Sequence, residues 1–543
     1  MTELSKNKVL TFIFFLLFGG LLSAVLCYEL HFDFHNYHYY NGFAFLNGRL
    51  GYDLAPAFQM SFGNPVLDVF TYLTANTLDL HIHLYSFVMG LFFGVLLHVL
   101  FLFNRLFFDF DTPKGKLAVV LSMTIGTTGF ATWFQIGSST GEIPVSILVL
   151  SGLYILIRHW FVLKDISKKH LFLAGFLLGT GAALKLTAAM YCITSGITVL
   201  LFFKKLPRPV HSIFWFLSGG LSGFLLFNGF WMIMLYKEYQ NPLFPFFNAI
   251  FKSDWFPPVN PRDTEHTAGS TPLSLLMIPL MTIVHSEKFP VVGYCTFTDF
   301  RFLIAFVLLA GFCCRAVKKN VAPVRDRTNF ILVFALTSYL FWLLFFLIIR
   351  YTVPIENILG ILFTLVIFSG ENPKSFLPLK IVMLCLLLST PFLSESWTDL
   401  KKGTTVTAAP DTPDINGNTL VLLANPASSL LFADIARKHP EARAVSLYSK
   451  PLLFWKTNGS ITGYGKFKEL RDKIIEEHNG DFLVIFMPKE SSFSPVFASI
   501  IQNAACSAAT KTFEIDGKKV EKATSHILFC KIPKKSALLL NTK

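Results

Sequence analysis

The apolar residues of this chain gather in blocks of about 20, the length of helix that crosses a hydrocarbon layer about 30 Å thick. Apolar side chains make up 53% of the 543 residues, and 60 of them are Phe, which is more than the core of a soluble domain needs. We therefore predict an all-α polytopic membrane domain over residues 1–393. Its apolar blocks lie at 8–27, 84–104, 117–136, 143–162, 212–235, 301–317, 329–349, 353–368 and 376–393.

The stretch 171–203 is too long for one span and carries Lys185 near its middle. A lysine at the centre of a bilayer is costly. Two shorter spans, 171–184 and 187–203, avoid this cost because they place Lys185 at an outer tip. The domain is then expected to have about eleven spans.

The net charge of +13 reports membrane orientation rather than a polyanionic partner. Lys and Arg cluster in alternate short loops, whereas the long loop 28–83 carries only Arg49. Positive charge marks the cytoplasmic loops. We therefore expect a cytoplasmic N-terminus, outer loops at 28–83 and 236–300, a short interfacial helix near 273–284, and no nucleic-acid partner.

The composition changes after residue 393. A polar linker at 394–418 leads into a segment, 419–535, in which short apolar runs alternate with helical patterns, as is typical of a small α/β domain. The expected topology places this domain outside the cytoplasm, where a disulfide between Cys506 and Cys530 is an open option. Strands are predicted at 419–424, 444–448, 481–487 and 525–532, and helices at 427–438, 466–478 and 494–505.

The first outer loop combines acids with many aromatic, His and Asn residues and few cations. Predicted helices at 35–48 and 65–78 would lie along the membrane interface. Asp33 could act as a base here, because glycosyl transfer needs a carboxylate that accepts the proton of the attacking hydroxyl. The alternative is an amphipathic belt whose polar groups satisfy one another. The acids of the loop are Glu29, Asp33, Asp53 and Asp68.

The run DFHNYHYYNGFAFLNGRLGYDLAPAFQMSFGNPVLD resembles a bacterial family of the glycosyltransferase C superfamily. So do TGEIPVSILVLSGL, GFLLGTGAALKLTAA, NPLFPFFNAIFKS, TDFR and RYTVPIE, and the resemblance covers about 8–370. It is to enzymes related to mannosyl- and aminoarabinose transferases. It implies a polyprenyl-phosphate sugar donor, inverting transfer outside the bacterial inner membrane, and a glycan, lipid or protein acceptor.

The resemblance also suggests site residues. Asp33 occupies the place of the catalytic carboxylate in the first outer loop, and Glu142 stands where this family usually has Asp. Gln135 stands where relatives carry an acid. Lys185 is the main candidate for binding the donor phosphate, with the snorkelling of its side chain to the interface as the alternative. Further candidates for substrate binding are Arg350, Arg301, His38, Asn36, Tyr37, Asp53 and Glu356.

Both arginines have a structural alternative, which is pairing with an acid such as Glu356 or Asp299. A metal site at His31, His35 and His38 is not expected, because their spacing matches no compact ligand motif. No cofactor is expected with certainty, although Asp33 with Glu142 could hold a divalent cation.

Two other functions fit parts of the sequence. A transporter or flippase for a lipid-linked saccharide would explain the many spans, but it predicts charges near mid-span along a pathway, whereas here they lie at outer ends. A non-catalytic scaffold would instead use the C-terminal α/β domain to bind an envelope partner, and it predicts that this domain functions alone.

Overall fold

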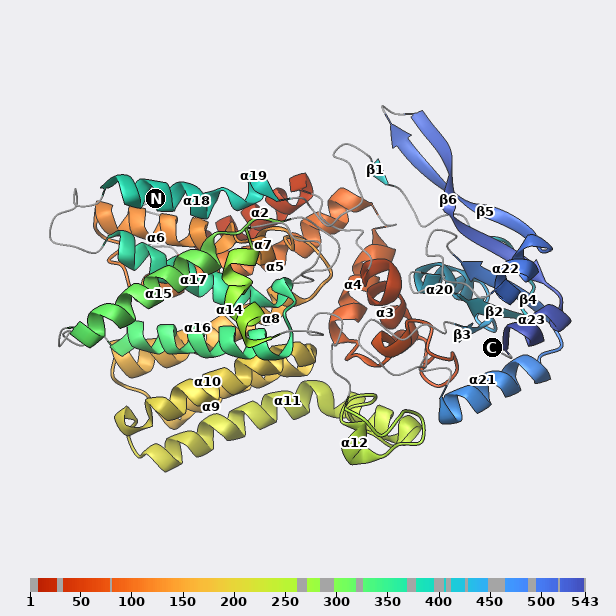
Figure 1. The fold of residues 1–543 in the computed structure, drawn as a ribbon, viewed down its shortest axis with the longest axis horizontal. Helices are drawn as coiled ribbons and strands as arrows, with labels where there is room; N and C mark the ends of the chain where they lie inside the picture. The colour runs from red at the N-terminus through yellow and green to blue at the C-terminus, as the bar shows by residue number, and fades with distance from the viewer. Residues whose placement is uncertain are drawn as a thin grey trace. The chain divides into compact units, whose positions relative to one another are not determined.

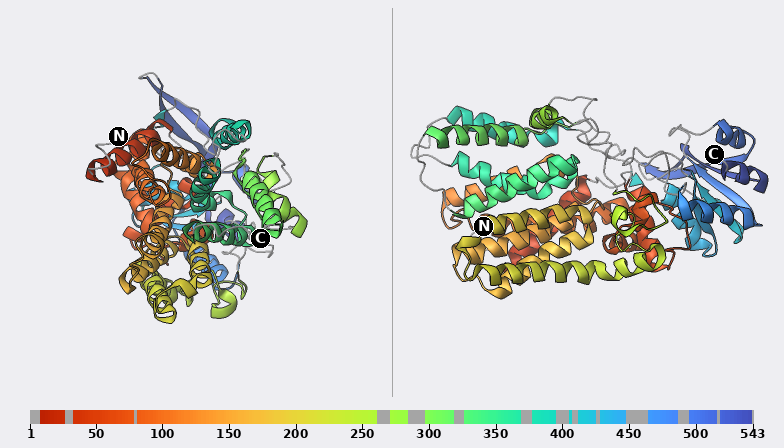
Figure 2. Two further views of the ribbon diagram at one scale, coloured as in Figure 1. Left: turned by 90° about the vertical axis from the view of Figure 1, so that its left-hand side faces the viewer. Right: turned by 60° about the horizontal axis from the view of Figure 1, so that its bottom comes forward.

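The computed structural model of the chain folds into two compact units (Figures 1 and 2). The first comprises Met1–Tyr28, Met89–Gly229 and Asp263–Trp397. The second comprises Glu29–Val88, Phe230–Arg262 and Thr398–Lys543. The structure describes residues 8–26, 33–78, 81–260, 271–283, 297–318, 326–368, 377–394, 405–406, 412–424, 428–447, 464–486, 495–515 and 518–541.

The first unit is a bundle of apolar helices (Figure 1). A helix lies at each predicted apolar block, and the predicted break at Lys185 separates two of them. The helices are α2 (Lys8–Leu26), α5 (Ile82–Asn104), α6 (Pro113–Thr127), α7 (Phe130–Trp133), α8 (Glu142–Ile157), α9 (Lys168–Leu184), α10 (Ala189–Leu201), α11 (Pro209–Tyr239), α14 (Pro272–Met281), α15 (Arg301–Lys318), α16 (Asp326–Phe345), α17 (Val353–Ile367), α18 (Leu377–Leu388) and α19 (Thr390–Leu393). Helices α5 and α11 contribute residues to both units.

Within the described ranges, six helices are long and apolar enough to cross a membrane. The expected all-α membrane domain is therefore confirmed, while the count of about eleven spans stays a prediction. The six are Lys8–Leu26, Ile82–Asn104, Glu142–Val162, Pro209–Tyr239, Asp326–Phe345 and Ile349–Ile367.

The bundle is held together by close packing. Helix α8 packs on α9, α6 on α17, and α10 on both α9 and α16. Small residues allow α9 and α11 to approach, since a Cβ on Gly179 would lie 1.9 Å from the carbonyl oxygen of Gly220. Such contacts between small residues are typical of membrane helices. The core contains Phe330, Phe334 and Trp342, all fully buried.

The second unit is built around a six-stranded mixed sheet of order β1-β5-β6-β4-β2-β3. Strand β2 is parallel to β3 and β4, whereas β6 is antiparallel to β4 and β5. The strands are β1 (Thr405–Val406), β2 (Thr419–Leu423), β3 (Arg443–Ser446), β4 (Asp481–Phe486), β5 (Ala505–Ile515) and β6 (Lys518–Ile532), and the helices of this segment are α20 (Ser429–Lys438), α21 (Gly465–Glu477), α22 (Pro495–Gln502) and α23 (Lys534–Asn541).

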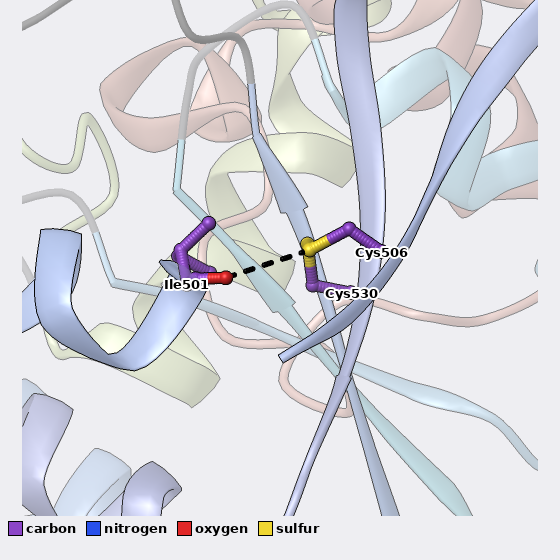
Figure 3. The surroundings of a disulfide bond; sticks show 3 residues. All are labelled: Ile501, Cys506 and Cys530. Atoms are coloured by element: carbon purple, nitrogen blue, oxygen red, sulfur yellow. Dashed lines mark hydrogen bonds between the residues drawn. A yellow bond between two sulfur atoms is a disulfide. The ribbon is translucent and has the colours of Figure 1, made fainter. Parts of the chain in front are cut away.

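The four predicted strands and three predicted helices of the α/β domain are present. Strands β1 and β5 and helix α23 were not predicted; β1 lies in the segment expected to be a linker, and β5 forms a long antiparallel pair with β6. A disulfide joins Cys506 of β5 to Cys530 of β6, and Cys506 Sγ lies 3.8 Å from the carbonyl oxygen of Ile501 (Figure 3). The open option of a bridge between these cysteines is therefore realised in the structure.

The first outer loop belongs to the same compact unit as the α/β domain. Its helices α3 (Tyr39–Leu46) and α4 (Val66–Thr77) pack on each other, and α20 packs on α3. Leu54 bridges in parallel to Val445 of β3, with its amide donating to the carbonyl oxygen of Ala444 at 2.8 Å. The loop thus extends the sheet at its β3 edge.

Candidate functional site

Glu142 begins helix α8 because the preceding residue turns the chain sharply. Gly141 has a φ of 84°, a left-handed conformation that favours glycine. The Glu142 carboxylate then lies in the first turn of α8, where the helix dipole stabilises negative charge. This side chain is only 4% exposed, so it needs a partner.

Lys185 supplies that partner from a break between helices. Its backbone is extended between α9 and the short 3-10 turn Leu186–Ala188, as the cost of an intramembrane lysine predicts. The Nζ atom donates to the carbonyl oxygen of Thr140 and to Oε1 of Glu142. Two unrelated segments of the first unit therefore meet at one ion pair.

Arg350 brings a second cation to the same carboxylate. It lies in the 3-10 turn Ile349–Thr352 between α16 and α17, and its Nε is 3.7 Å from Oε1 of Glu142. Its guanidinium carbon is 5.5 Å from the ring centroid of Tyr351, and the Lys185 Nζ is 5.7 Å from that centroid. The aromatic ring thus contacts both cations, as its negative face favours.

Polar neighbours fix the loops that carry these groups. The Gln135 amide donates to the carbonyl oxygen of Arg350 at 3.0 Å and to that of Ala131 at 2.6 Å. Thr140 donates its hydroxyl to Oε1 of Gln135 at 2.7 Å. The sequence analysis did not select Thr140 or Tyr351, although each stands in a motif that carries a chosen residue.

The cluster of Glu142, Lys185 and Arg350 carries one net positive charge, because two cations share one carboxylate. Within the described part of the chain, Oε2 of Glu142 is buried without a hydrogen-bond partner. Fixed cations in a largely dehydrated site bind anions strongly, and phosphate suits both lysine and arginine. The arrangement is thus suited to a phosphate or similar oxyanion.

Arg301 and Glu356 lie in a different polar network of the first unit. Arg301 is fully buried and pairs with Asp299 at 2.9 Å, one of the structural pairings anticipated from the sequence. It also donates to the carbonyl oxygens of Ile125 and Leu387. These contacts join α6, α15 and the end of α18, which supports a structural role for Arg301.

Glu356 is also fully buried, and it caps the short helix α7. Its carboxylate accepts from the backbone amides of Ala131 at 2.9 Å and Thr132 at 2.8 Å, groups that have no partner inside a helix. The contacts of Glu356 are thus with α7, whereas Arg350 Nε lies 3.7 Å from Oε1 of Glu142. These contacts support a capping role for Glu356.

Asp33 lies in the second unit, directly before a π-helical turn, Phe34–His38. Such turns are rare and occur often at functional sites. Asn36, Tyr37 and His38 lie within this turn and are buried, and His38 Nδ1 is 2.6 Å from Oδ1 of Asp68. His38 is therefore engaged with Asp68 inside the second unit, and a role of this turn in substrate binding stays a prediction.

His31 lies outside the described residues, as does Glu29. Within the described ranges, Asp33, His35 and His38 do not form a cluster of three metal-ligating groups.

Asp53 is fully satisfied within the second unit. It accepts from Arg49 Nη2 at 2.8 Å, from the hydroxyl of Tyr40 at 2.7 Å and from the amide of Ala444 at 2.9 Å. Burial and the Asp53 charge raise the pKa of Tyr40 well above its ordinary value, which keeps the phenol a donor. These contacts hold the first outer loop on the edge of the sheet, beside β3.

Asp33 and the Glu142–Lys185–Arg350 cluster belong to different compact units. The expectation that the acid and the cations serve one pocket therefore stays a prediction.

The fold and this cluster together define a polytopic membrane protein whose helical bundle holds a buried carboxylate between two cations. No protein-family model matches the chain, and no curated protein matches it. Among solved structures, the chain is similar to the crystal structure of ArnT from Cupriavidus metallidurans bound to undecaprenyl phosphate, with a TM-score of 0.50 and 11% sequence identity. The match covers 96% of this chain and 97% of ArnT. The likeness of fold noted from the sequence is therefore confirmed over nearly the whole chain.

Proposed function

We propose that the chain is a membrane glycosyltransferase that takes its sugar from a polyprenyl-phosphate-linked donor. The observation that carries this proposal is the cluster of Glu142, Lys185 and Arg350, in which two cations share one buried carboxylate. The likeness to ArnT, whose structure contains undecaprenyl phosphate, supports the same donor class.

In the proposed reaction, Lys185 and Arg350 bind the phosphate of the donor. Negative charge grows on that phosphate as its bond to the sugar breaks, so fixed cations stabilise the transition state more than the bound donor. Glu142 holds the two cations in place before the donor arrives. Glu142 also assists the transfer, as a second carboxylate in addition to Asp33.

The proposed transfer is a single displacement with inversion at the anomeric carbon. The acceptor hydroxyl oxygen attacks that carbon while the bond to the phosphate oxygen breaks. Asp33 accepts the hydroxyl proton as general base. The products are the glycosylated acceptor and the free polyprenyl phosphate.

We propose that the protein lies in the bacterial inner membrane with its C-terminal domain outside the cytoplasm. The bridge between Cys506 and Cys530 supports this orientation, because disulfides persist in oxidising compartments. The scarcity of Lys and Arg in loop 28–83 supports it as well. The acceptor class would then be an envelope glycan, lipid or protein.

The purified full chain in proteoliposomes tests the proposal. Undecaprenyl-phosphate-linked hexoses and pentoses are offered together with an extract of envelope acceptors, and free undecaprenyl phosphate is measured by mass spectrometry. We expect its release to match donor loss and to require the extract. A matched variant, Lys252→Ala, changes an exposed lysine and should release it at the unchanged rate. Movement of intact lipid-linked saccharide across the membrane, without cleavage, would favour the transporter instead.

A further inference from the structure

Three metal-ligating side chains meet in the first unit, at the end of helix α8 remote from Glu142. They are His159, Asp165 and His170, and their ligand atoms all lie within 4.8 Å of one another. Helix α8 spans 16 residues from Glu142, or about 24 Å at about 1.5 Å per residue, so this group is separate from the proposed phosphate site.

The local backbone brings the three side chains together. His159 lies in a π-helical turn, Arg158–Val162, that follows α8, and His170 lies in the first turn of α9. The connecting loop closes through a hydrogen bond from the amide of Asp165 to the carbonyl oxygen of His159 at 2.9 Å. The π-helical turn is the kind of insertion that recurs at functional sites.

The side chains already contact one another. His159 Nδ1 lies 2.8 Å from Oδ1 of Asp165, and the two imidazole rings stack with their centroids 3.6 Å apart. His170 Nδ1 is 3.3 Å from the Ser167 hydroxyl, an interaction that would leave its Nε2 to face a ligand. Two imidazoles and one carboxylate thus form a compact donor set.

We propose that His159, Asp165 and His170 bind one divalent transition-metal ion, with Zn²⁺ as the best match. Imidazole and carboxylate are zinc ligands, and three protein ligands with one water complete a tetrahedron. Bonds of about 2.0–2.1 Å place ligand atoms about 3.3 Å apart. Ligand-atom separations of 2.8 Å to 4.8 Å are close to that spacing, and one of the two stacked imidazole rings must rotate so that both ring planes converge on the ion.

Nearby positive side chains lower the affinity for a metal ion but do not prevent its binding. Arg158 donates to the Tyr154 hydroxyl at 2.9 Å, and Lys168 lies 5.5 Å from the ring centroid of Trp215, so both are engaged elsewhere. Lys164 and Lys169 are exposed, and water and salt screen their charges. The bound ion would link the segment that follows α8 to the first turn of α9.

The purified full chain, stripped with EDTA and dialysed, tests this proposal by zinc titration and elemental analysis. We expect one zinc ion per chain, and a raised unfolding temperature when zinc is added. His159→Ala and His170→Ala should weaken zinc binding more than tenfold, and Asp165→Asn should weaken it less. His211→Ala is the matched control, because His211 is exposed and contacts Trp215 instead. With Co²⁺ in place of zinc, the wild type should show the intense visible absorption of a tetrahedral site. The variants of the three ligand residues should not show it.

Two results would overturn the proposal. One is a wild-type chain that takes up no zinc above the EDTA-treated blank. The other is full zinc binding by both histidine variants. If His159→Ala does not fold, the zinc affinity of Asp165→Asn tests the proposal instead. The Asp165 side chain is 55% exposed, so its replacement disturbs no core.

Discussion

The Nε atom of Arg350 lies 3.7 Å from Oε1 of Glu142, the same oxygen to which Lys185 donates. One carboxylate therefore orients two cations that come from different helix breaks. Removing the acid and removing a cation should then have opposite effects on anion binding, and this contrast separates a phosphate site from a purely structural ion pair.

Glu142→Gln removes the negative charge between the two cations. We expect undecaprenyl phosphate to bind more tightly, because the cluster then carries two net positive charges instead of one. Sugar transfer should nevertheless slow by at least about tenfold if Glu142 assists the reaction. Separate measurement of kcat and of the dissociation constant of undecaprenyl phosphate checks this. Weaker binding in a folded variant would contradict the proposed arrangement.

Asp33→Asn keeps the shape of the side chain but removes the base. A general base typically contributes about 10²–10⁴-fold to a rate, so transfer should fall by about that factor. Binding of undecaprenyl phosphate should be unchanged, since Lys185 and Arg350 provide it. Asp254→Asn is the control, because Asp254 is an exposed acid in the same unit. Unchanged turnover of Asp33→Asn would remove Asp33 from the mechanism.

Arg49→Met leaves the Asp53 carboxylate buried without its main partner. Breaking a buried ion pair on one side typically costs about 3–5 kcal/mol, so the free energy of unfolding should drop by about that much. The double variant Arg49→Met with Asp53→Leu should recover part of the loss. Denaturant unfolding of the purified chain measures both. A stable Asp53→Asn variant that loses substrate binding would instead assign Asp53 to the substrate.

His478 should make the second unit less stable in acid. Burial lowers the pKa of this half-buried imidazole below its ordinary value of 6.5, while its Nε2 lies 3.1 Å from the carbonyl oxygen of Asp481. The unfolded chain therefore binds the proton first, so stability present above pH 6.5 is lost as the pH falls through that value.

Unfolding midpoints at about pH 7.5 and about pH 5 measure this loss. The difference between them should shrink in His478→Gln, which cannot be protonated. An undiminished difference would show that other groups cause the acid sensitivity.

Much of the helical bundle follows from the sequence, because apolar blocks of fixed length have few alternatives in a membrane. The break at Lys185 was predicted for the same reason, since a lysine within one continuous span would carry a large cost. Glu142 and Arg350 were also chosen from the sequence, although their shared contact was not foreseen. Arg350 was considered as a partner of Glu356, six residues away, and instead lies near Glu142.

Contacts between distant segments explain the remaining differences. The sequence of loop 28–83 does not show that Leu54 would pair with β3, because that edge forms about 390 residues later in the chain. The sequence likewise does not show the contacts of Asp53. This residue was selected as a substrate ligand, but it accepts hydrogen bonds from Arg49 and from the amide of Ala444. Strand β5 escaped prediction because ACSAATKTFEI lacks a strong apolar run and depends on pairing with β6.

The most direct test of the account is the affinity of the purified chain for undecaprenyl phosphate in nanodiscs. Wild type is compared with Lys185→Ala, Arg350→Ala and the exposed control Lys252→Ala. Hydrogen bonds to charged groups contribute about 1.5–3 kcal/mol, so each of the first two variants should bind at least about tenfold more weakly. The control should bind as the wild type does. Equal affinity of all four folded proteins would contradict the central claim that Lys185 and Arg350 bind the donor phosphate.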